Sequence, residues 1–446
     1  MRQSFPDGFI EHLNQAPGFK EGAFIDSHKK DSELSLRLHP RKGNNLFQDH
    51  VKVSWCSEGR YLSERPDFTL DPRFHGGAYY VQEASSMCIQ TILNELSPDS
   101  KELVVLDLCG APGGKSTLVA SWLDGEGLLL SNEVIRSRAG ILKENMDRWG
   151  YPNVIVSNND PRQFGKLEGI FDIVIIDAPC SGSGMFRKDP AAMEHWSQEA
   201  VEHCAARQKR IIGDVWPSLK KGAFLIYSTC SFSIEEDEEI CNWLIEEENA
   251  ELIEIKSFEQ FPEIYKSSLG YRFYPDQVKG EGFFIAVIQK KTNEQQNLMR
   301  PAKLREIPSE IQPFIGINKG IKYHHNHLGN LLVPTFFEDY LSLIEKHLHI
   351  IKCGIKAGEI KGKNFIPDHE LAMSVDLNKD FSAIELSKEE ALRYLKKEAI
   401  PNTEGASGWV QLRFDGITLG WGNALSNRIN NGLPKSWRIR KELDLS

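Results

Sequence analysis

Two cysteines stand at the ends of apolar, strand-like runs, where thiols could do chemistry. Residues 171–176 are followed by Asp177 and Cys180, and residues 223–227 are followed by Cys230. If the runs are neighbouring parallel strands, both thiols project over one crevice, because ligands bind outside the carboxyl ends of such strands. The alternative is a pair of inert buried cysteines, and the presence of two thiols at adjacent strand ends outweighs it.

A thiolate in such a crevice has a specific use on a pyrimidine ring. Carbon 5 of cytosine is a poor nucleophile, but adding sulfur to carbon 6 makes an enamine whose carbon 5 can attack a methyl sulfonium. Removing the carbon 5 proton then expels the sulfur. This needs a nucleophilic thiolate, a group for the proton and an acid at the N3/N4 edge of the base. Cys230, Cys180 and Asp177 can fill these roles, and the chemistry alone leaves the two cysteines exchangeable.

A glycine-rich loop lies earlier in the chain, after the apolar run 104–108. Its residues are Cys109, Gly110, Ala111, Pro112, Gly113, Gly114 and Lys115. Glycines let the backbone approach a ligand closely, and the start of the following helix offers free N–H groups. The glycine spacing does not fit a Walker A loop. The loop therefore predicts a nucleoside-type cofactor.

Two acids extend this prediction. Glu133 ends the next apolar run, about 20 residues after the loop, where an acid can accept both hydrogen bonds of a ribose diol. Asp160 follows the third run, where an acid can lie near an adenine amine. The alternatives are a helix-capping acid for Glu133 and an ordinary loop acid for Asp160. Loop and acids together leave S-adenosylmethionine and a dinucleotide open.

The elements that position these residues form an alternating pattern. Apolar runs at 104–108, 128–130, 154–156, 173–176, 223–227 and 283–288 are separated by helical stretches. Near-continuous apolar strands between helices indicate a parallel sheet covered on both faces. We therefore predict an α/β, Rossmann-like domain over residues 76–292, in which a final antiparallel strand would be unexceptional.

Smaller units flank this domain. Residues 1–75 contain alternating runs at 34–38 and 51–55, typical of a small α+β cap. After a polar linker, we expect one unit at 301–390 and another at 391–446. The last unit has a basic strip with one tryptophan, suited to RNA phosphates and bases. Its members are Arg428, Lys435, Trp437, Arg438 and Arg440. The alternative is a solvated tail with a core tryptophan.

Composition limits the compartment and the kinds of site that the protein can have. The chain has 446 residues, 40% of them hydrophobic, with no signal-like N-terminus and no apolar run long enough for a membrane helix, so we expect a cytoplasmic protein. Eight cysteines without a CxxC pair argue against a zinc site or a disulfide framework.

The net charge of −10 argues weakly against binding of nucleic acid. Residues 301–446 hold 20 basic and 18 acidic residues, so the excess of acidic residues lies before residue 301. Local basic patches suffice for phosphate contacts.

The motifs together resemble the Fmu/Sun family of RNA cytosine-5 methyltransferases. The marks are residues 82–86, the loop 109–115, residues 177–180 with 186–190, and the pair Thr229 and Cys230. The loop departs at Gly110, where the family usually has alanine, and at Ser116, where threonine is common. The resemblance implies that Cys230 attacks carbon 6 and Cys180 helps to release product. It also implies S-adenosylmethionine contacts at 109–115, Glu133, Asp160 and Asp177.

The C-terminal third resembles the RNA-binding extension of the RsmF-type branch. Residues 361–373, 416–422 and 433–438 carry this likeness. It implies a final PUA-like barrel and methylation of small-subunit (16S) ribosomal RNA near the decoding region, as naked RNA or as an assembled subunit, by a monomeric enzyme. Alternatives are a transfer RNA methyltransferase and a catalytically dead assembly factor. A methyl group at the decoding region would face the aminoglycoside groove, and unchanged inhibitory concentrations on expression would contradict an effect on drug resistance.

Two further clusters invite interpretation. His324, His325 and His327, with His347 and His349, lack a supporting acid or cysteine pattern, so we expect a turn at 323–328 and no metal. The acidic run 235–239 directly follows Cys230. We expect it to begin a solvated helix with Ser233 as N-cap, because acids are favourable in a first turn.

Overall fold

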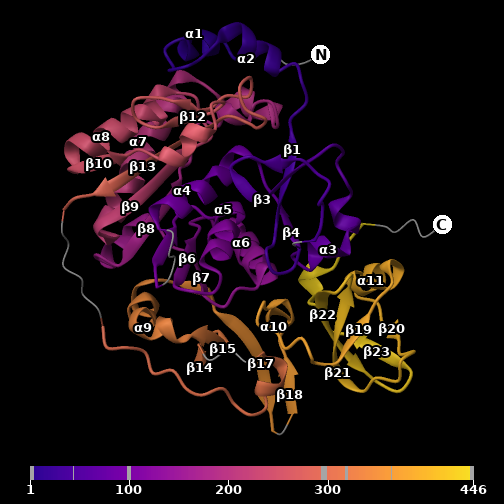
Figure 1. Ribbon diagram of the computed structural model, residues 1–446. Helices are drawn as coiled ribbons and strands as arrows, with labels where there is room; N and C mark the ends of the chain where they lie inside the picture. The colour runs from indigo at the N-terminus through magenta and orange to yellow at the C-terminus, as the bar shows by residue number, and fades with distance from the viewer. Residues whose placement is uncertain are drawn as a thin grey trace.

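The computed structural model describes residues 5–43, 45–97, 102–292, 299–316, 320–362 and 364–441. A ten-stranded mixed sheet lies at the centre of the molecule (Figure 1). Its strands are β5 (Val104–Asp107), β6 (Leu128–Asn132), β7 (Val154–Ser157), β8 (Phe171–Asp177), β9 (Leu219–Thr229), β10 (Ala250–Ile253), β11 (Tyr265–Lys266), β12 (Tyr271–Phe273), β13 (Phe283–Lys290) and β16 (Ile350–Cys353). The order is β11-β12-β13-β9-β8-β5-β6-β7-β16, and β10 pairs with β13.

The six apolar runs predicted as strands are confirmed. Strands β9, β8, β5, β6 and β7 are parallel neighbours, and β13 lies antiparallel to β9. The carboxyl ends of β5, β8 and β9 therefore meet at one edge, as the positions of the loop and the two cysteines require.

Helices cover both faces of the sheet. On one face lie α4 (Ile89–Leu96), α5 (Gly114–Leu123) and α6 (Arg136–Trp149). On the other lie α7 (Gln198–Val215), α8 (Glu238–Glu247) and α9 (Glu338–His347). Each layer buries a continuous apolar core against the strands, which explains why the strands are apolar on both faces.

The N-terminal region has two parts. Helices α1 (Phe9–Leu13) and α2 (Glu21–Ser27) lie at the top of Figure 1, and their aromatic residues pack on Phe186, Trp196 and Phe232. A four-stranded antiparallel sheet follows in the order β2-β3-β1-β4, with α3 (Pro72–His75) before its last strand. Its strands are β1 (Leu34–Leu38), β2 (Lys52–Val53), β3 (Cys56–Leu62) and β4 (Tyr79–Val81). An α+β cap is therefore confirmed.

Two small sheets build the C-terminal third, in orange and yellow in Figure 1. The first has the order β14-β15-β17-β18 and is followed by α10 (His369–Met373). The second is a five-stranded sheet in the order β19-β21-β22-β23-β20, with α11 (Lys388–Leu395). The strands are β14 (Ile321–Asn326), β15 (Gly329–Pro334), β17 (Ile355–Lys361), β18 (Asn364–Pro367), β19 (Ala383–Glu385), β20 (Ile400–Pro401), β21 (Gly408–Phe414), β22 (Ile417–Ala424) and β23 (Arg428–Asn431).

Strand pairing crosses the predicted unit boundaries. β4, beyond residue 75, pairs with β1 of the cap, and β19, before residue 391, pairs with β21. β16 pairs with β7 and so joins the central sheet, although it lies between 301 and 390. Strand pairing is a long-range property that periodicity along the chain does not reveal. The division at 75, 292 and 390 therefore stays a prediction.

The expected turn at 323–328 is wrong over most of its length. Residues up to Asn326 belong to β14, which forms a hairpin with β15 and pairs Asn326 with Gly329. Only residues 327–328 make the turn. Among the described residues, no group of three or more His, Cys, Asp and Glu side chains is arranged to hold a metal ion. None of their helices has the length and apolar character to cross a membrane.

Candidate active site

The glycine-rich loop connects β5 to α5, as predicted. The Gly110 N–H donates to the carbonyl of Asn132 at the end of β6 (2.7 Å), and Asn145 Nδ2 of α6 donates to the Pro112 carbonyl (2.7 Å). Gly113, the N-cap of α5, has φ of 123°, a conformation that side chains disfavour. These contacts fix the loop at the carboxyl edge of the sheet, directly before the first N–H groups of α5.

The two departures from the family pattern lie against one another. A Cβ added at Gly110 would lie 2.8 Å from Ser116 Oγ. That hydroxyl donates to Asp107 Oδ2 at 2.6 Å inside the protein. Gly110 therefore leaves room for the Ser116 hydroxyl to reach Asp107. A side chain introduced at position 110 would require Ser116 to move or to be replaced.

Glu133 lies beside this loop. The carboxylate is almost fully buried, accepts a hydrogen bond from the Ile135 N–H (2.9 Å) and pairs with Arg138 (3.3 Å). Arg138 also donates to the Ala111 carbonyl at 2.9 Å, which connects Glu133 to the loop. The bond to the Ile135 N–H is a turn contact just before α6, which has Ile135 as its N-cap residue and no side-chain cap, so the helix-capping alternative is wrong. Ribose binding by Glu133 stays a prediction.

Asp160 lies after β7, at the start of a short 3₁₀ helix. Its carboxylate accepts from the Arg162 N–H (3.1 Å) and pairs with the Arg162 side chain (3.2 Å), and its side chain is 41% exposed. The neighbouring Asn159 is hydrogen-bonded to Asn132 at the end of β6. Asp160 is therefore near the same sheet edge, and its contact with adenine stays a prediction.

Asp177 connects the loop to the cysteines. One of its oxygens lies 2.7 Å from Lys115 Nζ, and the other accepts from Ser228 Oγ at 2.9 Å. Burial opposes the charge of Lys115, but the Asp177 carboxylate outweighs this and raises the pKa of Lys115. The cation is thereby held at the junction of β5, β8 and β9.

The two predicted thiols meet. Cys180 Sγ lies 3.1 Å from Cys230 Sγ, and both side chains are partly exposed. The hydrogen bond with Cys230, with added burial, raises the pKa of the Cys180 thiol well above its usual range. Cys180 is therefore held protonated in this pair, so the site contains a thiol that can donate or pass on a proton.

Three of the five acids in the run after Cys230 are buried, contrary to our expectation of a solvated run, and only Glu239 is exposed. Glu236 is fully buried, in the 3₁₀ helix Ile234–Glu236, and Ser233 makes no side-chain cap there. The Glu236 carboxylate accepts from the Ser181 N–H (2.7 Å) and from the hydroxyls of Ser181 and Ser231 (both 2.6 Å). It thus bridges the residues that directly follow the two cysteines.

The next two acids of the run are also buried. Asp237 accepts a hydrogen bond from Thr229 Oγ1, and it lies 3.2 Å from Arg272 of β12. Glu238 accepts from Arg272 Nε at 2.8 Å. A buried guanidinium more than thirty residues away compensates these charges. Only the spacing of acids immediately after the Thr-Cys pair could have drawn attention to Glu236.

The predicted RNA-contacting residues do not join this site. Arg428, Lys435, Arg438 and Arg440 have exposed side chains in the last unit. Trp437 is half-buried, and its ring packs edge-on against His369 (4.4 Å between centroids) and under Arg148 (4.9 Å). These contacts match the core-tryptophan alternative, and RNA contact at this strip stays a prediction.

Comparisons with known proteins identify the family of the chain. Family models match residues 5–84 ("N-terminal domain of 16S rRNA methyltransferase RsmF"), 93–289 ("16S rRNA methyltransferase RsmB/F") and 381–439 ("Methyltransferase RsmF PUA domain"). Ribosomal RNA small subunit methyltransferase F of Shewanella woodyi is 32% identical over 96% of this chain and 92% of its own length. The protein of that name from Vibrio parahaemolyticus is 32% identical over 96% and 97%. The chain belongs to the ribosomal RNA small subunit methyltransferase F family.

Solved structures support the fold of this family member. A methyltransferase homologue from Pyrococcus horikoshii is 28% identical, with a TM-score of 0.53 over 63% of this chain and 93% of that chain. NSun6 from the same organism, solved with SFG, has a TM-score of 0.54 at 19% identity, over 66% of this chain and all of that chain, and shows the fold alone. The family confirms the predicted cofactor class, S-adenosylmethionine.

The residues present fit that cofactor. Asp107, Glu133 and Asp177 place carboxylates around the loop, which suits a cationic sulfonium. Among the described residues, Asp107 Oδ1 is buried without a hydrogen-bond partner. Burial raises the pKa of Asp107 to about 6, although Ser116 partly offsets this. Asp107 was not singled out from the sequence, although it ends β5 as Asp177 ends β8, and the same strand-end position could have found it.

We expect S-adenosylmethionine affinity to fall as the pH drops through 6. The ionised form of Asp107 favours a cationic ligand, and protonation below its pKa removes that charge. Calorimetry should therefore give a dissociation constant about tenfold larger at pH 5 than at pH 7.5. In Asp107→Asn, the affinity should be weak at both pH values. An unchanged pH dependence in that variant would show that another group is responsible.

Proposed function

We propose that this protein transfers a methyl group from S-adenosylmethionine to carbon 5 of a cytosine in 16S ribosomal RNA, near the decoding region. The observation that carries the proposal is the pair of thiols, Cys180 and Cys230, 3.1 Å apart beside the cofactor loop. Methylation at carbon 5 needs a nucleophile and a separate proton-handling group within reach of one ring. Methylation of an exocyclic nitrogen or a ribose hydroxyl needs neither thiol.

In this proposal Cys230 is the nucleophile. Its sulfur bonds to carbon 6, and the electron pair of the 5,6 double bond moves towards carbon 5. The bound cofactor supplies an electrophilic methyl group, which carbon 5 takes. A base in the crevice, such as a water molecule, takes the carbon 5 proton; its C–H electron pair restores the double bond, and the sulfur–carbon 6 bond breaks with its electron pair on Cys230. The raised pKa of Cys180 keeps that thiol protonated beside Cys230. Cys180 can therefore donate a hydrogen bond to the departing Cys230 thiolate, 3.1 Å away, and so help release the product.

Asp177 and Lys115 have supporting roles. The Asp177 carboxylate, 37% exposed, stands at the end of β8 beside the end of β9, where it can contact the N3/N4 edge of the target base. The Lys115 ammonium, 2.7 Å from Asp177, adds positive charge where a Cys230 thiolate would form. The proposed cofactor contacts are the loop 109–115, Glu133, Asp160 and Asp177.

Ribosomal RNA as the substrate is supported by the C-terminal match and the names of the relatives. The matched PUA segment, 381–439, contains the exposed cations Arg428, Lys435 and Arg438. Their charge suits phosphate contacts. The target cytosine must leave its stack, which costs a few kcal/mol, and remote RNA contacts can supply that energy.

The decisive experiment is methyl transfer to isolated small ribosomal subunits and to naked 16S RNA, followed by bisulfite sequencing of the product. We expect a protected cytosine in RNA treated with enzyme and cofactor, and none without cofactor. Transfer RNA and a Cys230→Ala enzyme serve as controls. Methylation of transfer RNA alone would favour that substrate, and binding without methyl transfer would favour a dead assembly factor.

A further inference from the structure

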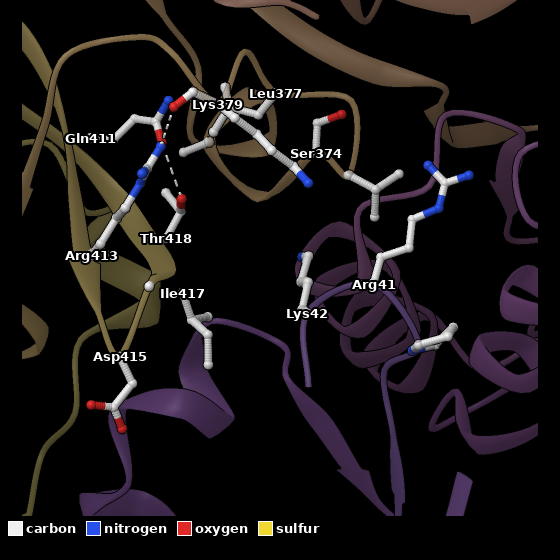
Figure 2. A pocket seen from close by; sticks show the side chains of 14 residues that line it. Arg41, Lys42, Ser374, Leu377, Lys379, Gln411, Arg413, Asp415, Ile417 and Thr418 are labelled. Carbon is white, nitrogen blue, oxygen red and sulfur yellow. Dashed lines mark hydrogen bonds between the residues drawn. The ribbon is translucent and has the colours of Figure 1, made fainter. Parts of the chain in front are cut away.

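An open cavity of about 610 Å³ lies where three parts of the chain meet (Figure 2). Its walls come from residues 40–42 after β1, residues 372–379 around the end of α10, and residues 411–418 of the β21–β22 hairpin. The cavity is separate from the thiol pair. Lys42 Nζ donates to the Arg148 carbonyl (2.8 Å) at the end of α6, whose other end begins near Glu133. The cavity therefore lies towards the amino edge of the central sheet, away from Cys180 and Cys230.

One wall carries two cations without a carboxylate partner. Arg413 donates to Gln411 Oε1 (3.0 and 2.6 Å) and to the Lys379 carbonyl (3.1 Å), all of them neutral acceptors. The Lys379 side chain is exposed and extends over the cavity in Figure 2. Within the part of the chain that the structure describes, neither residue forms an ion pair. Gln411 is fully buried and fixes the Arg413 fork in place.

The cations of the opposite wall, Arg41 and Lys42, make contacts between different parts of the chain. Arg41 pairs with Asp124 (2.7 Å) and Asp376 (3.5 Å). The Lys42 ammonium donates to the carbonyls of Arg148 and Met373 (2.8 and 2.7 Å), and burial lowers its pKa to about 7. These contacts tie the cap to the central domain and to the residues after α10. The cavity therefore lies at a well-packed contact between three parts of the chain. The cations without a carboxylate partner, Lys379 and Arg413, lie on one side of it.

The remaining lining residues add an apolar floor and one acid. Ala372, Leu377 and Ile417 are buried beneath the cavity. Asp415 is the carboxylate among the lining residues, and it lies 3.9 Å from Arg73 of α3. An apolar floor beside two uncompensated cations suits a ligand with a flat organic part and an anionic group. The volume falls in the range of about 300–1,000 Å³ typical of small-ligand sites.

We propose that this cavity anchors one or two nucleotides of single-stranded RNA, with a phosphate on Lys379 and Arg413 and the base or sugar over the apolar floor. The proposal rests on RNA being the substrate. Arginine held by a neighbouring amide presents its donors in a fixed fork, which matches phosphate geometry. A contact here positions the RNA without acting at the reacting base. It is distinct from the strip Arg428–Arg440.

The test is RNA binding by full-length Lys379→Glu and Lys379→Glu/Arg413→Gln, with fluorescein-labelled hexauridylate and naked 16S RNA as probes. We expect affinity to fall about tenfold or more. The slope of log affinity against log salt should fall by about 0.7 for each phosphate that the variant no longer neutralises. The KM for RNA should rise while kcat stays unchanged. The single variant Lys379→Glu keeps the test decisive, because the exposed Lys379 side chain makes no hydrogen bond or ion pair with any residue that the structure describes.

Matched controls separate this inference from the proposed function. Lys221→Glu reverses an exposed charge on β9 that lines neither site, and should leave RNA affinity unchanged. S-adenosylmethionine affinity, measured by calorimetry, should be unchanged in every variant. If wild-type enzyme methylates RNA and the cavity variants bind it equally tightly, the cavity inference fails alone. If cavity variants lose RNA affinity but no cytosine is methylated, the proposed function fails alone. A competition experiment covers the remaining ligand class. If polyglutamate, but not unlabelled hexauridylate, displaced bound 16S RNA from the wild type and not from the cavity variants, the cavity would bind an acidic protein and the inference would be overturned.

Discussion

Cys180→Ala is expected to accumulate a covalent RNA–protein complex that survives denaturation, whereas Cys230→Ala is expected to form none. Without the Cys180 thiol, the proton transfer that accompanies release is impaired while the Cys230–carbon 6 bond is already formed. Without Cys230 no such bond can form. Turnover should fall about 10²–10⁴-fold in Cys180→Ala and by more than about 10³-fold in Cys230→Ala.

The assignment of roles follows the Thr-Cys pattern of the family, and both thiols are close enough to act on one ring. They lie 3.1 Å apart, and the bond to Cys230 raises the pKa of Cys180, which keeps the Cys180 sulfur protonated and less nucleophilic. Denaturing electrophoresis with labelled 16S RNA measures the complex. Cys204→Ala, which removes a partly exposed thiol from α7, is the matched control and should turn over like the wild type. A trapped complex in Cys230→Ala instead would exchange the two roles.

The parts of the fold that the sequence predicts are those set by local pattern. Strands β5 to β9 are continuous apolar runs because helices cover both of their faces. Cys180 and Cys230 could be placed together because parallel strands end at one edge. The loop at 109–115 was recognisable because its glycines and the following helix are adjacent in sequence.

The parts that the sequence missed depend on distant partners. The run containing Glu236 looks solvated until Ser181, Ser231 and Arg272 are placed around it. β16 joins the central sheet across nearly two hundred residues, which no periodicity indicates. Trp437 packs on His369 and Arg148, so a pattern of basic and aromatic residues could not distinguish packing from exposure. In each case, tertiary contacts decide what local composition leaves open.

Glu236→Ala is expected to lower kcat by about 10²-fold or more while leaving S-adenosylmethionine affinity unchanged. The wild-type carboxylate accepts the Ser181 N–H and the hydroxyls of Ser181 and Ser231, and so fixes the residue after each cysteine. Removing it takes the acceptor from the Ser181 N–H and the two hydroxyls, and it also removes the longer contact from Gln208 Nε2 (3.5 Å). Each donor that stays unsatisfied costs about 1–3 kcal/mol. The loops should then relax, and a displacement of about 1 Å between reacting groups can cost about 10²-fold in rate.

A positioning role predicts a graded response that general destabilisation does not. Glu236→Gln keeps one oxygen for the Ser181 N–H, and the two hydroxyls can rotate to accept from the new amide, so its kcat should recover to within about tenfold of wild type. The KM for RNA should change little in either variant, and single-turnover measurements should show slower formation of the Cys230 adduct. Glu239→Ala removes an exposed acid from the same run and should behave like the wild type. Equal kcat in Glu236→Ala and wild type would show that the thiol pair holds its geometry without this carboxylate. Equal losses in the alanine and glutamine variants, with lowered cofactor affinity, would instead show that Glu236 serves the fold as a whole.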